Sequence, residues 1–531
     1  MAASDEKHAV EPALQQAEHA SDPSKAHADV VVNARLASEK ERQMTLMQGI
    51  RLYPKAIGWS LLISTCIIME GFDMSLVNNF YAFPQFNKKF GEPDGKGAMR
   101  SLHTGRQGAA VGSIIGLFLN GWASDKLGYR WTCIISLTWL AGTVAIFFTA
   151  QNVQTLLAAE ILCGLPWGVF QTVTVSYASE VCPVALRGYL TTYVNFCWGV
   201  GQELGIGIIK AMINREDEYA FRIPYALQWI WPLPLIIGIY LAPESPWWLV
   251  RKGRTEDAKK SLLRLTSLDR ETDFDADETV AMMVHTTALE EKITTGASYL
   301  DCFKGVDLRR TEVVCMVWAI QNLSGNSFSN YSTYFLKAAG LDTSDSYSFA
   351  LGQYAMNMVC VFIAWGLMAR GVGRRTLYLV GLSALFTILL VMGFLGLAPG
   401  SKRDQTSIAT GSLMIVWAFF YQCTVGTVNV VGIINAVLTP YMLNPTAWNW
   451  QNFTGFFWAG ICFLCIIYTY FRVPEPKGRT FAELDLLFEK HISARKFAST
   501  EIDVFHEAVD ESTMERYEKT TEARLESVSR A

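Results

Sequence analysis

The stretch PESPWWLVRKGR, Pro243–Arg254, divides this 531-residue sequence into two apolar halves. It opens a polar segment that ends near Arg310 and holds most of the charge between the first and last apolar runs. Runs of about 20 apolar residues, the length at which an α-helix crosses a bilayer, recur about six times on each side of it. The sequence therefore predicts an all-α polytopic membrane protein whose halves are related to each other.

The composition agrees with a chain that lies mostly in lipid. Hydrophobic residues make up 51% and charged residues only 18%, below the roughly 25% charge of soluble domains. The apolar runs lack the alternation of a transmembrane barrel, so helices are the remaining way to satisfy the backbone in a bilayer. The 11 cysteines are scattered without metal-ligand spacing. We expect no metal, no cofactor, no catalytic site and no nucleic-acid partner.

Ten of the expected crossings have clear limits. In the first half they are 57–80, 107–123, 132–150, 153–178, 189–213 and 224–242, and in the second half 311–336, 349–369, 376–397 and 453–471. Basic residues fall in short loops on one face, which the positive-inside rule assigns to the cytoplasm. The predicted divisions are a disordered cytoplasmic tail (1–56), an N-terminal helix bundle (57–242), a cytoplasmic central loop with short helices (243–310), a C-terminal helix bundle (311–471) and a cytoplasmic tail (472–531).

Two short amphipathic helices are expected within the central loop. TEDAKKSLLRL (255–265) has leucines along one side, with Glu256 and Asp257 near its start, and Thr255 is a candidate N-cap. ADETVAMMVHTTALEEKI (276–293) has the same character. We expect both helices to lie on the cytoplasmic face rather than to cross the membrane.

Three charged motifs mark the predicted cytoplasmic loops. The first is Gly121-x-x-x-Asp125-x-x-Gly128-x-Arg130, the second places Glu180 and Arg187 at either end of a short loop, and the third is Glu244 of PESP. Such groups can form pairs that hold the cytoplasmic side closed and break when it opens. Their alternative interpretation is ordinary loop charge. The predicted cytoplasmic gate comprises Asp125, Arg130, Glu180, Arg187 and Glu244.

Several motifs together resemble a known family. GWASDKLGYR, the Glu180/Arg187 spacing, PESPWWL, QNLSGNSFSNYSTYF, GVGRRT and PEPKGRTFAELD are similar to motifs of the sugar porters of the major facilitator superfamily. LCGLPWGVFQTV and VVGIINAVLTPYMLNPTAWNW look like fungal maltose/α-glucoside permeases. The resemblance implies two six-helix bundles around a central sugar site, alternating access, proton symport and a plasma-membrane location. It implies a transporter rather than an enzyme.

Membrane-embedded amides are the candidate sugar ligands, because amide groups hydrogen-bond sugar hydroxyls in a partly wet cavity. Gln202 matches the family's glutamine of span 5, and Gln321 and Asn322 match its paired amides of span 7. Asn326 lies one turn further on, and Asn357 is a candidate in span 8. Alternatively, these amides bridge helices within the membrane.

Glu70 and Asp73 are the candidate proton-coupling residues. Carboxylates within a membrane are unfavourable unless they are functional or paired. These two lie three residues apart, so they share a helix face, and burial favours their protonated forms. The alternative is a structural ion pair. Glu160, Glu203 and Lys210 are weaker candidates.

The second half is shorter than the first and lacks charge where charge is expected. No Asp, Glu, Lys or Arg occurs from Gln405 to Phe471, and the counterpart of the Glu180/Arg187 loop is missing. We therefore expect the fold to be truncated around spans 10 and 11, with the join near Val428–Asn429. Ser113 and Arg370 also stand where the resemblance leads us to expect acidic residues. We favour two short spans in this region over one long helix, which would place the C-terminus outside.

The sequence thus indicates transport of a sugar, an α-glucoside such as maltose, by proton-coupled alternating access. The expected partners are a small-molecule sugar, protons and the lipid bilayer. One alternative is a sugar receptor that signals through its tails without transport, and another is an inactive, truncated permease.

Overall fold

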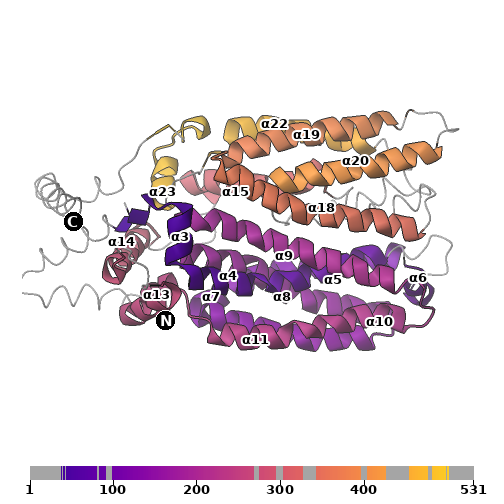
Figure 1. Ribbon diagram of the computed structural model, residues 1–531, viewed down its shortest axis with the longest axis horizontal. Coiled ribbons are helices and arrows are strands. Elements are labelled where there is room, and N and C mark those ends of the chain that lie inside the picture. Colours follow the sequence, from indigo (N-terminus) through magenta and orange to yellow (C-terminus); the bar gives the residue numbers. More distant parts are fainter. Residues whose placement is uncertain are drawn as a thin grey trace, which may run out of the picture.

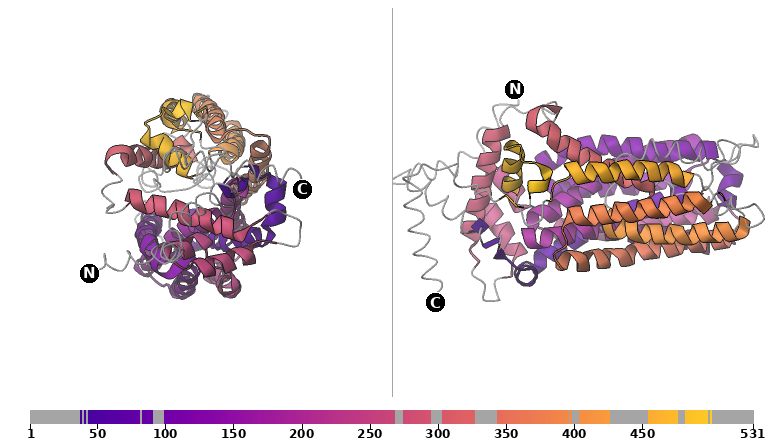
Figure 2. Two further views of the ribbon diagram at one scale, coloured as in Figure 1. Left: turned by 90° about the vertical axis from the view of Figure 1, so that its left-hand side faces the viewer. Right: turned by 90° about the horizontal axis from the view of Figure 1, so that it is seen from above.

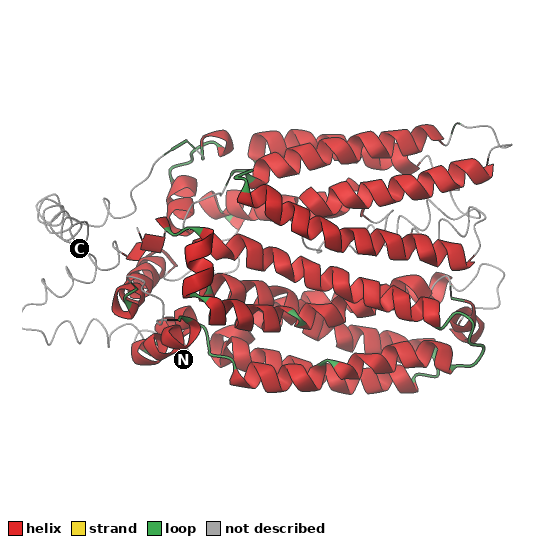
Figure 3. Cartoon of the chain, viewed as in Figure 1, coloured by secondary structure: helices red, strands yellow, loops and turns green. Residues whose placement is uncertain are grey.

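The computed structural model describes residues 37–80 without 39 and 42, 83–90, 99–267, 274–294, 303–326, 343–397 without 396, 403–425, 454–475, and 481–500 without 498. Helices dominate these residues, and no strand occurs among them (Figure 3). The long helices lie side by side along the longest axis of the molecule (Figure 1). Seen from one end, the helices of the first half form one group and those of the second half another (Figure 2). The predicted all-α membrane architecture is confirmed.

The first group begins with two helices that follow each other almost without a break. Pro54 lies in the first turn of α4, where backbone N–H groups have no partner within the helix, so the missing N–H of proline costs no hydrogen bond. The group consists of α4 (Pro54–Ser64), α5 (Cys66–Phe80), α7 (Met99–Thr149), α8 (Val153–Val181), α9 (Val184–Ala211), α10 (Tyr219–Ala226), η2 (Leu227–Ile230) and α11 (Pro232–Leu241).

Helix α7 contains two membrane crossings rather than one. Its apolar part, Gly108–Thr149, has 42 residues, about 63 Å as a straight helix, whereas the hydrocarbon core is about 30 Å thick. The backbone reverses at Gly128, where φ is 82° and ψ is 168°. A β-carbon at that position would lie 2.6 Å from an oxygen of Glu244. Glycine therefore permits both the turn and the close approach that separate the predicted second and third spans.

Close packing between neighbouring helices relies on glycine. A methyl group on Gly112 or Gly164 would overlap the opposing backbone of α8 or α7. Gly71 of α5 and Gly201 of α9 are in the same situation. Because lipid is as apolar as the side chains, such small residues favour helix association by bringing backbones together.

The second group shows antiparallel neighbours. Arg375 near the start of α19 donates to the Tyr470 carbonyl near the end of α22, and Gly393 near the end of α19 packs on Phe456 near the start of α22. The group consists of α15 (Gly305–Gln321), η4 (Asn322–Asn326), α18 (Thr343–Ala369), α19 (Arg374–Leu395), α20 (Arg403–Thr424) and α22 (Thr454–Arg472).

Helix α20 ends where the shortened segment of the sequence begins. Its last residue is Thr424, and a turn follows at Val425, whose carbonyl lies 3.5 Å from the Tyr378 hydroxyl. Since Tyr378 is near the start of α19, Val425 and Thr454 lie at opposite ends of the bundle. The expected join at Val428–Asn429 and the rest of the predicted two-span segment lie outside the described residues, as does the second part of predicted span 7.

Short helices gather at one end of the bundle, which is called the loop end below (Figures 1 and 2). They are α3 (Leu46–Leu52), α12 (Pro246–Arg251), α13 (Thr255–Leu265), α14 (Ala276–Thr294), α23 (Phe481–Glu489) and η7 (Ala494–Lys496), while α6 (Pro84–Phe90) lies at the opposite end. Both predicted loop helices are confirmed. The predicted cap is wrong, because Arg254 precedes the first helical residue and Thr255 already belongs to the helix.

Candidate functional site

Glu70 and Asp73 of α5 point toward other helices of the first group. Both are buried, with 3% and 0% of their surfaces exposed. Glu70 accepts a hydrogen bond from the Gln171 amide of α8, at 2.5 Å. Asp73 accepts one from the Gln228 amide of η2, at 2.8 Å. In the part of the chain that the structure describes, neither forms an ion pair.

The weaker acidic and basic candidates occupy different places. Glu160 of α8 is 1% exposed and lies near Asp73. Glu203 of α9 is half-buried. Lys210, in the last turn of α9, donates to the Ser348 hydroxyl of α18 at 2.9 Å. Lys210 therefore connects the two groups of helices at the end opposite the loops.

Two of the predicted sugar ligands lie on the helices that meet between the groups. Gln202 belongs to α9 and Asn357 to α18, and both are buried. The two helices are adjacent in Figure 1, and Met358 packs against Gly199. The amide oxygens of Gln202 and Asn357 are buried and have no hydrogen-bond partner among the residues that the structure describes. Unsatisfied buried acceptors at this junction are suited to receive hydroxyl donors of a ligand.

The predicted amides of span 7 lie where that span loses its regular helical form. Gln321 ends α15, and its amide donates to the Tyr378 hydroxyl at 3.2 Å. Asn322 and Asn326 bound the π-helical segment η4, in which Gly325 has a φ of 100°. Their side chains lie outside the described part. A π-helical segment loosens the regular backbone bonding and is frequent at functional sites.

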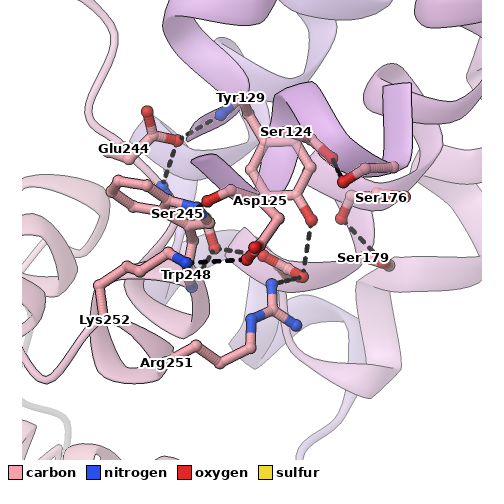
Figure 4. A network of polar contacts seen from close by, with 12 residues as sticks. Ser124, Asp125, Tyr129, Ser176, Ser179, Glu244, Ser245, Trp248, Arg251 and Lys252 are labelled. Atoms are coloured by element: carbon pink, nitrogen blue, oxygen red, sulfur yellow. Dashed lines mark hydrogen bonds and ion pairs between the residues drawn. The ribbon is translucent and has the colours of Figure 1, made fainter. Parts of the chain in front are cut away.

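Glu244 of PESP binds the start of the third crossing (Figure 4). Its carboxylate accepts backbone N–H groups from Tyr129 at 3.1 Å, Arg130 at 3.3 Å and Ser245 at 3.1 Å. Burial raises the pKa of Glu244, whereas these three N–H donors act in the opposite direction. The Arg130 guanidinium itself stacks over Tyr240 at 5.0 Å. Glu244, at the start of the central loop, thus binds the backbone that follows the turn at Gly128.

The other two predicted acids bind helix α12. Glu180 accepts hydrogen bonds from Arg251 at 2.6 Å, from the Tyr129 hydroxyl at 2.8 Å and from the Ser245 hydroxyl. Asp125 pairs with Lys252 at 3.0 Å. These contacts, with those of Glu244, form the loop-end network of Asp125, Tyr129, Arg130, Glu180, Glu244, Ser245, Arg251 and Lys252.

Arg187 binds the end of the preceding helix. Its Nε donates to the Ser179 carbonyl of α8 at 3.0 Å, whereas Glu180 pairs with Arg251. Arg251 and Lys252 were not among the gate residues predicted from the sequence. The signal for them was the pair of bases that follows PESPWWLV in the same short segment.

The second half repeats the attachment of Glu244 with a residue that sequence analysis also missed. Glu475 of PEP accepts the backbone N–H groups of Arg374 at 3.0 Å and Arg375 at 2.9 Å. Gly373 precedes them as Gly128 precedes Tyr129, and a side chain there would meet Glu475. The internal repeat is therefore seen in the contacts of the structure as well as in the amino-acid sequence.

Comparison with known proteins agrees with these features. The model of the family described as "Sugar (and other) transporter" matches residues 59–432 and 427–488. The general alpha-glucoside permease of Saccharomyces cerevisiae is 38% identical over 506 residues, covering 89% of this chain and 82% of its own length. The maltose permease MAL61 of Saccharomyces cerevisiae is 38% identical over 511 residues, covering 90% and 83%.

The alignment also shows that this chain lacks residues that the relative has. The alignment spans 506 residues, whereas 89% of this 531-residue chain is fewer, so some residues of the relative lie opposite gaps in this chain. The two stretches matched by the family model overlap at 427–432, a range that includes the expected join.

A solved structure supports the fold. The major facilitator superfamily proton:xylose symporter XylE, bound to 6-bromo-6-deoxy-D-glucose, superimposes with a TM-score of 0.68 at 20% identity. The match covers 82% of this chain and 100% of that one. Seven apolar stretches of the described residues are also long enough to cross a membrane, one of them being the double crossing of α7. The chain therefore belongs to the sugar transporter family, and it is a multi-pass membrane carrier with the major facilitator fold.

Proposed function

We propose that this carrier moves an α-glucoside such as maltose across the plasma membrane by alternating access, together with a proton. The observation that carries the substrate class is the identity of 38% over about nine-tenths of the chain to the α-glucoside and maltose permeases. The buried acids of α5 carry the proposal of proton coupling, because they have amide partners in place of cations.

In this proposal Glu70 and Asp73 take up and release the proton. A buried carboxyl group without a cation is stable when protonated and unstable when ionised, so its charge can be linked to a change of conformation. Sugar hydroxyls bind the amides of both helix groups. The proposed ligands are Gln202, Gln321, Asn322, Asn326 and Asn357.

The loop-end network acts as the cytoplasmic gate in this proposal. Asp125, Arg130, Glu180 and Glu244 hold the central loop on the first helix group when the carrier is closed on that side, and Arg187 holds the start of α9 on the end of α8. Opening separates some of these contacts, and a ligand or proton that favours the open state supplies the free energy for their loss.

Transport into proteoliposomes tests the proposal. The purified full chain is reconstituted, and entry of radiolabelled maltose is measured with and without an inward proton gradient. We expect accumulation above the external concentration only with the gradient. Equilibration alone would refute proton coupling, and saturable binding without entry would favour a sugar receptor that does not transport.

An inactive, truncated permease is the second candidate, because the family model matches in two stretches that overlap at 427–432 and a relative has residues that this chain lacks. Sequencing the transcript across Val428–Asn429 tests it. An in-frame segment with an acidic and a basic residue, absent here, would show that the given chain is shortened. Restoring that segment should then raise maltose entry from the background level.

A further inference from the structure

We propose that Glu160 of α8 is a third proton-carrying carboxyl group, which exchanges a proton with Asp73 on the side facing the end opposite the loops. This inference rests on the proposed proton coupling. It follows from the position of Glu160 relative to Asp73, from an unpartnered buried oxygen, and from the order of three acids along the bundle.

Glu160 lies on the face of α8 that meets Asp73. Cys163 follows it by three residues and therefore shares its helix face. The Cys163 thiol lies 4.0 Å from a carboxylate oxygen of Asp73. The carboxyl groups of Glu160 and Asp73 are close enough to repel each other when both are ionised. A single proton shared between them relieves that repulsion.

The surroundings of Glu160 do not explain its presence as a structural group. It is 1% exposed, and its Oε2 has no hydrogen-bond partner among the described residues. An unsatisfied buried oxygen destabilises a fold, and an ionised one does so more strongly. A glutamate at this position therefore destabilises the fold, and a role in proton transfer would explain its presence.

No described basic side chain acts on the cluster from the helices around it. Among the described residues, Asp73 is the charged group that acts on Glu160, and it also acts on Glu70 of its own helix. Tyr225 of α10, buried and stacked on Phe147 of α7 at 4.8 Å, faces both Glu160 and Asp73. The nearby titratable groups are therefore Glu70, Asp73, Cys163 and Tyr225.

The three acids follow one another along the membrane normal. Helix α8 starts at the end opposite the loops, and Glu160 lies about 10 Å from its first residue at 1.5 Å per residue. Gln171, the partner of Glu70, lies about 16 Å further along α8. Asp73 is one turn from Glu70 and contacts Cys163, so it lies between the other two. The order from the opposite end is Glu160, Asp73 and Glu70.

This order defines a simple proton transfer. The O–H bond of protonated Glu160 breaks while a new O–H bond forms on the Asp73 carboxylate. The negative charge moves from Asp73 to Glu160, which can be reprotonated from the end opposite the loops. The amide of Gln228 stays on Asp73 and orients the accepting carboxylate.

The test compares E160Q with a matched control in proteoliposomes containing the full chain. S60A is the control, since Ser60 of α4 also has a buried oxygen without a partner among the described residues but carries no exchangeable carboxyl proton. Proton-driven accumulation of maltose is measured beside maltose exchange at equal pH, which needs no net proton release. We expect E160Q to reduce accumulation at least tenfold and to retain exchange, whereas S60A retains both.

A second variant keeps the proposal testable if E160Q fails to fold. E160D retains a carboxyl group, and we expect it to accumulate maltose with a pH profile displaced from that of the natural chain. If E160Q accumulates maltose as well as the natural chain does and with the same pH profile, the role of Glu160 is refuted. It is also refuted if E160D folds and exchanges maltose but does not accumulate it. Failure of the natural chain itself to accumulate maltose would instead refute the proposed proton coupling.

Discussion

The pair of Glu180 and Arg251 combines a short distance with partial burial. Their side chains are 15% and 39% exposed, and they lie 2.6 Å apart. Because solvent screens the arginine, we expect a coupling free energy of about 1 kcal/mol from a double-mutant cycle of E180Q and R251Q. Thermal unfolding in detergent measures it. Additive effects of the two substitutions would show that the contact contributes nothing, and the more exposed Arg254–Asp257 pair serves as the control.

Gln202 permits a test of sugar recognition at one residue. Its amide oxygen is buried without a partner at the α9–α18 junction. If this oxygen accepts a sugar hydroxyl, Q202A should raise the KM for maltose about tenfold, equivalent to about 1.4 kcal/mol. Uptake kinetics measure the change. N120A is the matched control, because Asn120 has a buried, unpartnered oxygen on α7, and an equal effect of both variants would count against a ligand role.

At the scale of a single element, the reversal inside α7 depends on Gly128. We expect G128A to destabilise the fold by at least about 1–2 kcal/mol, because φ is 82° there and a β-carbon would approach Glu244. G142A, in the same helix with nothing within 4 Å of a new β-carbon, should leave stability unchanged or slightly increased. Thermal unfolding of the two variants checks both outcomes, and equal stability would contradict the packing argument.

The segment before the first crossing docks onto the loop end. Glu41 accepts the backbone N–H of Val184, the first residue of α9, at 2.9 Å, and Lys40 pairs with Glu278 of α14 at 2.9 Å. Burial raises the pKa of Glu41 above its ordinary value, although the Val184 N–H and Arg187 oppose the change.

This shift predicts the pH dependence of docking. Because the pKa of Glu41 is higher in the docked segment than in the undocked one, docking is coupled to protonation of Glu41. The resulting stabilisation of the docked state is complete below the pKa of undocked Glu41. It is lost as the pH rises through the pKa of docked Glu41. Hydrogen exchange of residues 43–53, corrected for intrinsic rates, should therefore show more protection at pH 5 than at pH 7.5. E41Q should remove the difference. Greater protection of the natural chain at pH 7.5 would contradict the sign.

Across the whole molecule, the features that sequence predicts well are local ones. Apolar length defined the crossings, and periodicity defined α13 and α14, because both depend on neighbours a few residues apart. The partners of the site residues were not predicted. Arg251 for Glu180, Gln171 for Glu70 and the Arg374–Arg375 backbone for Glu475 are brought together only when separate helices pack. The sequence predicted Glu180 and Arg187 as gate residues without naming their partners, and tertiary packing pairs Glu180 with Arg251.

The arrangement of both ends of the chain predicts its topology. Arg309 at the start of α15 donates to the Ile492 carbonyl at 2.8 Å, and its guanidinium lies over Phe488 of α23. The segment after α22 therefore shares the loop end with α3 and with α12 to α14, which requires an even number of crossings. We expect epitope tags at the N-terminus, after Thr294 and at the C-terminus to resist protease in intact cells and to be cut after permeabilisation. A tag between Leu397 and Arg403, at the opposite end, should be cut in intact cells. Cleavage of the C-terminal tag on intact cells, with the N-terminal tag protected, would show that the chain crosses an odd number of times.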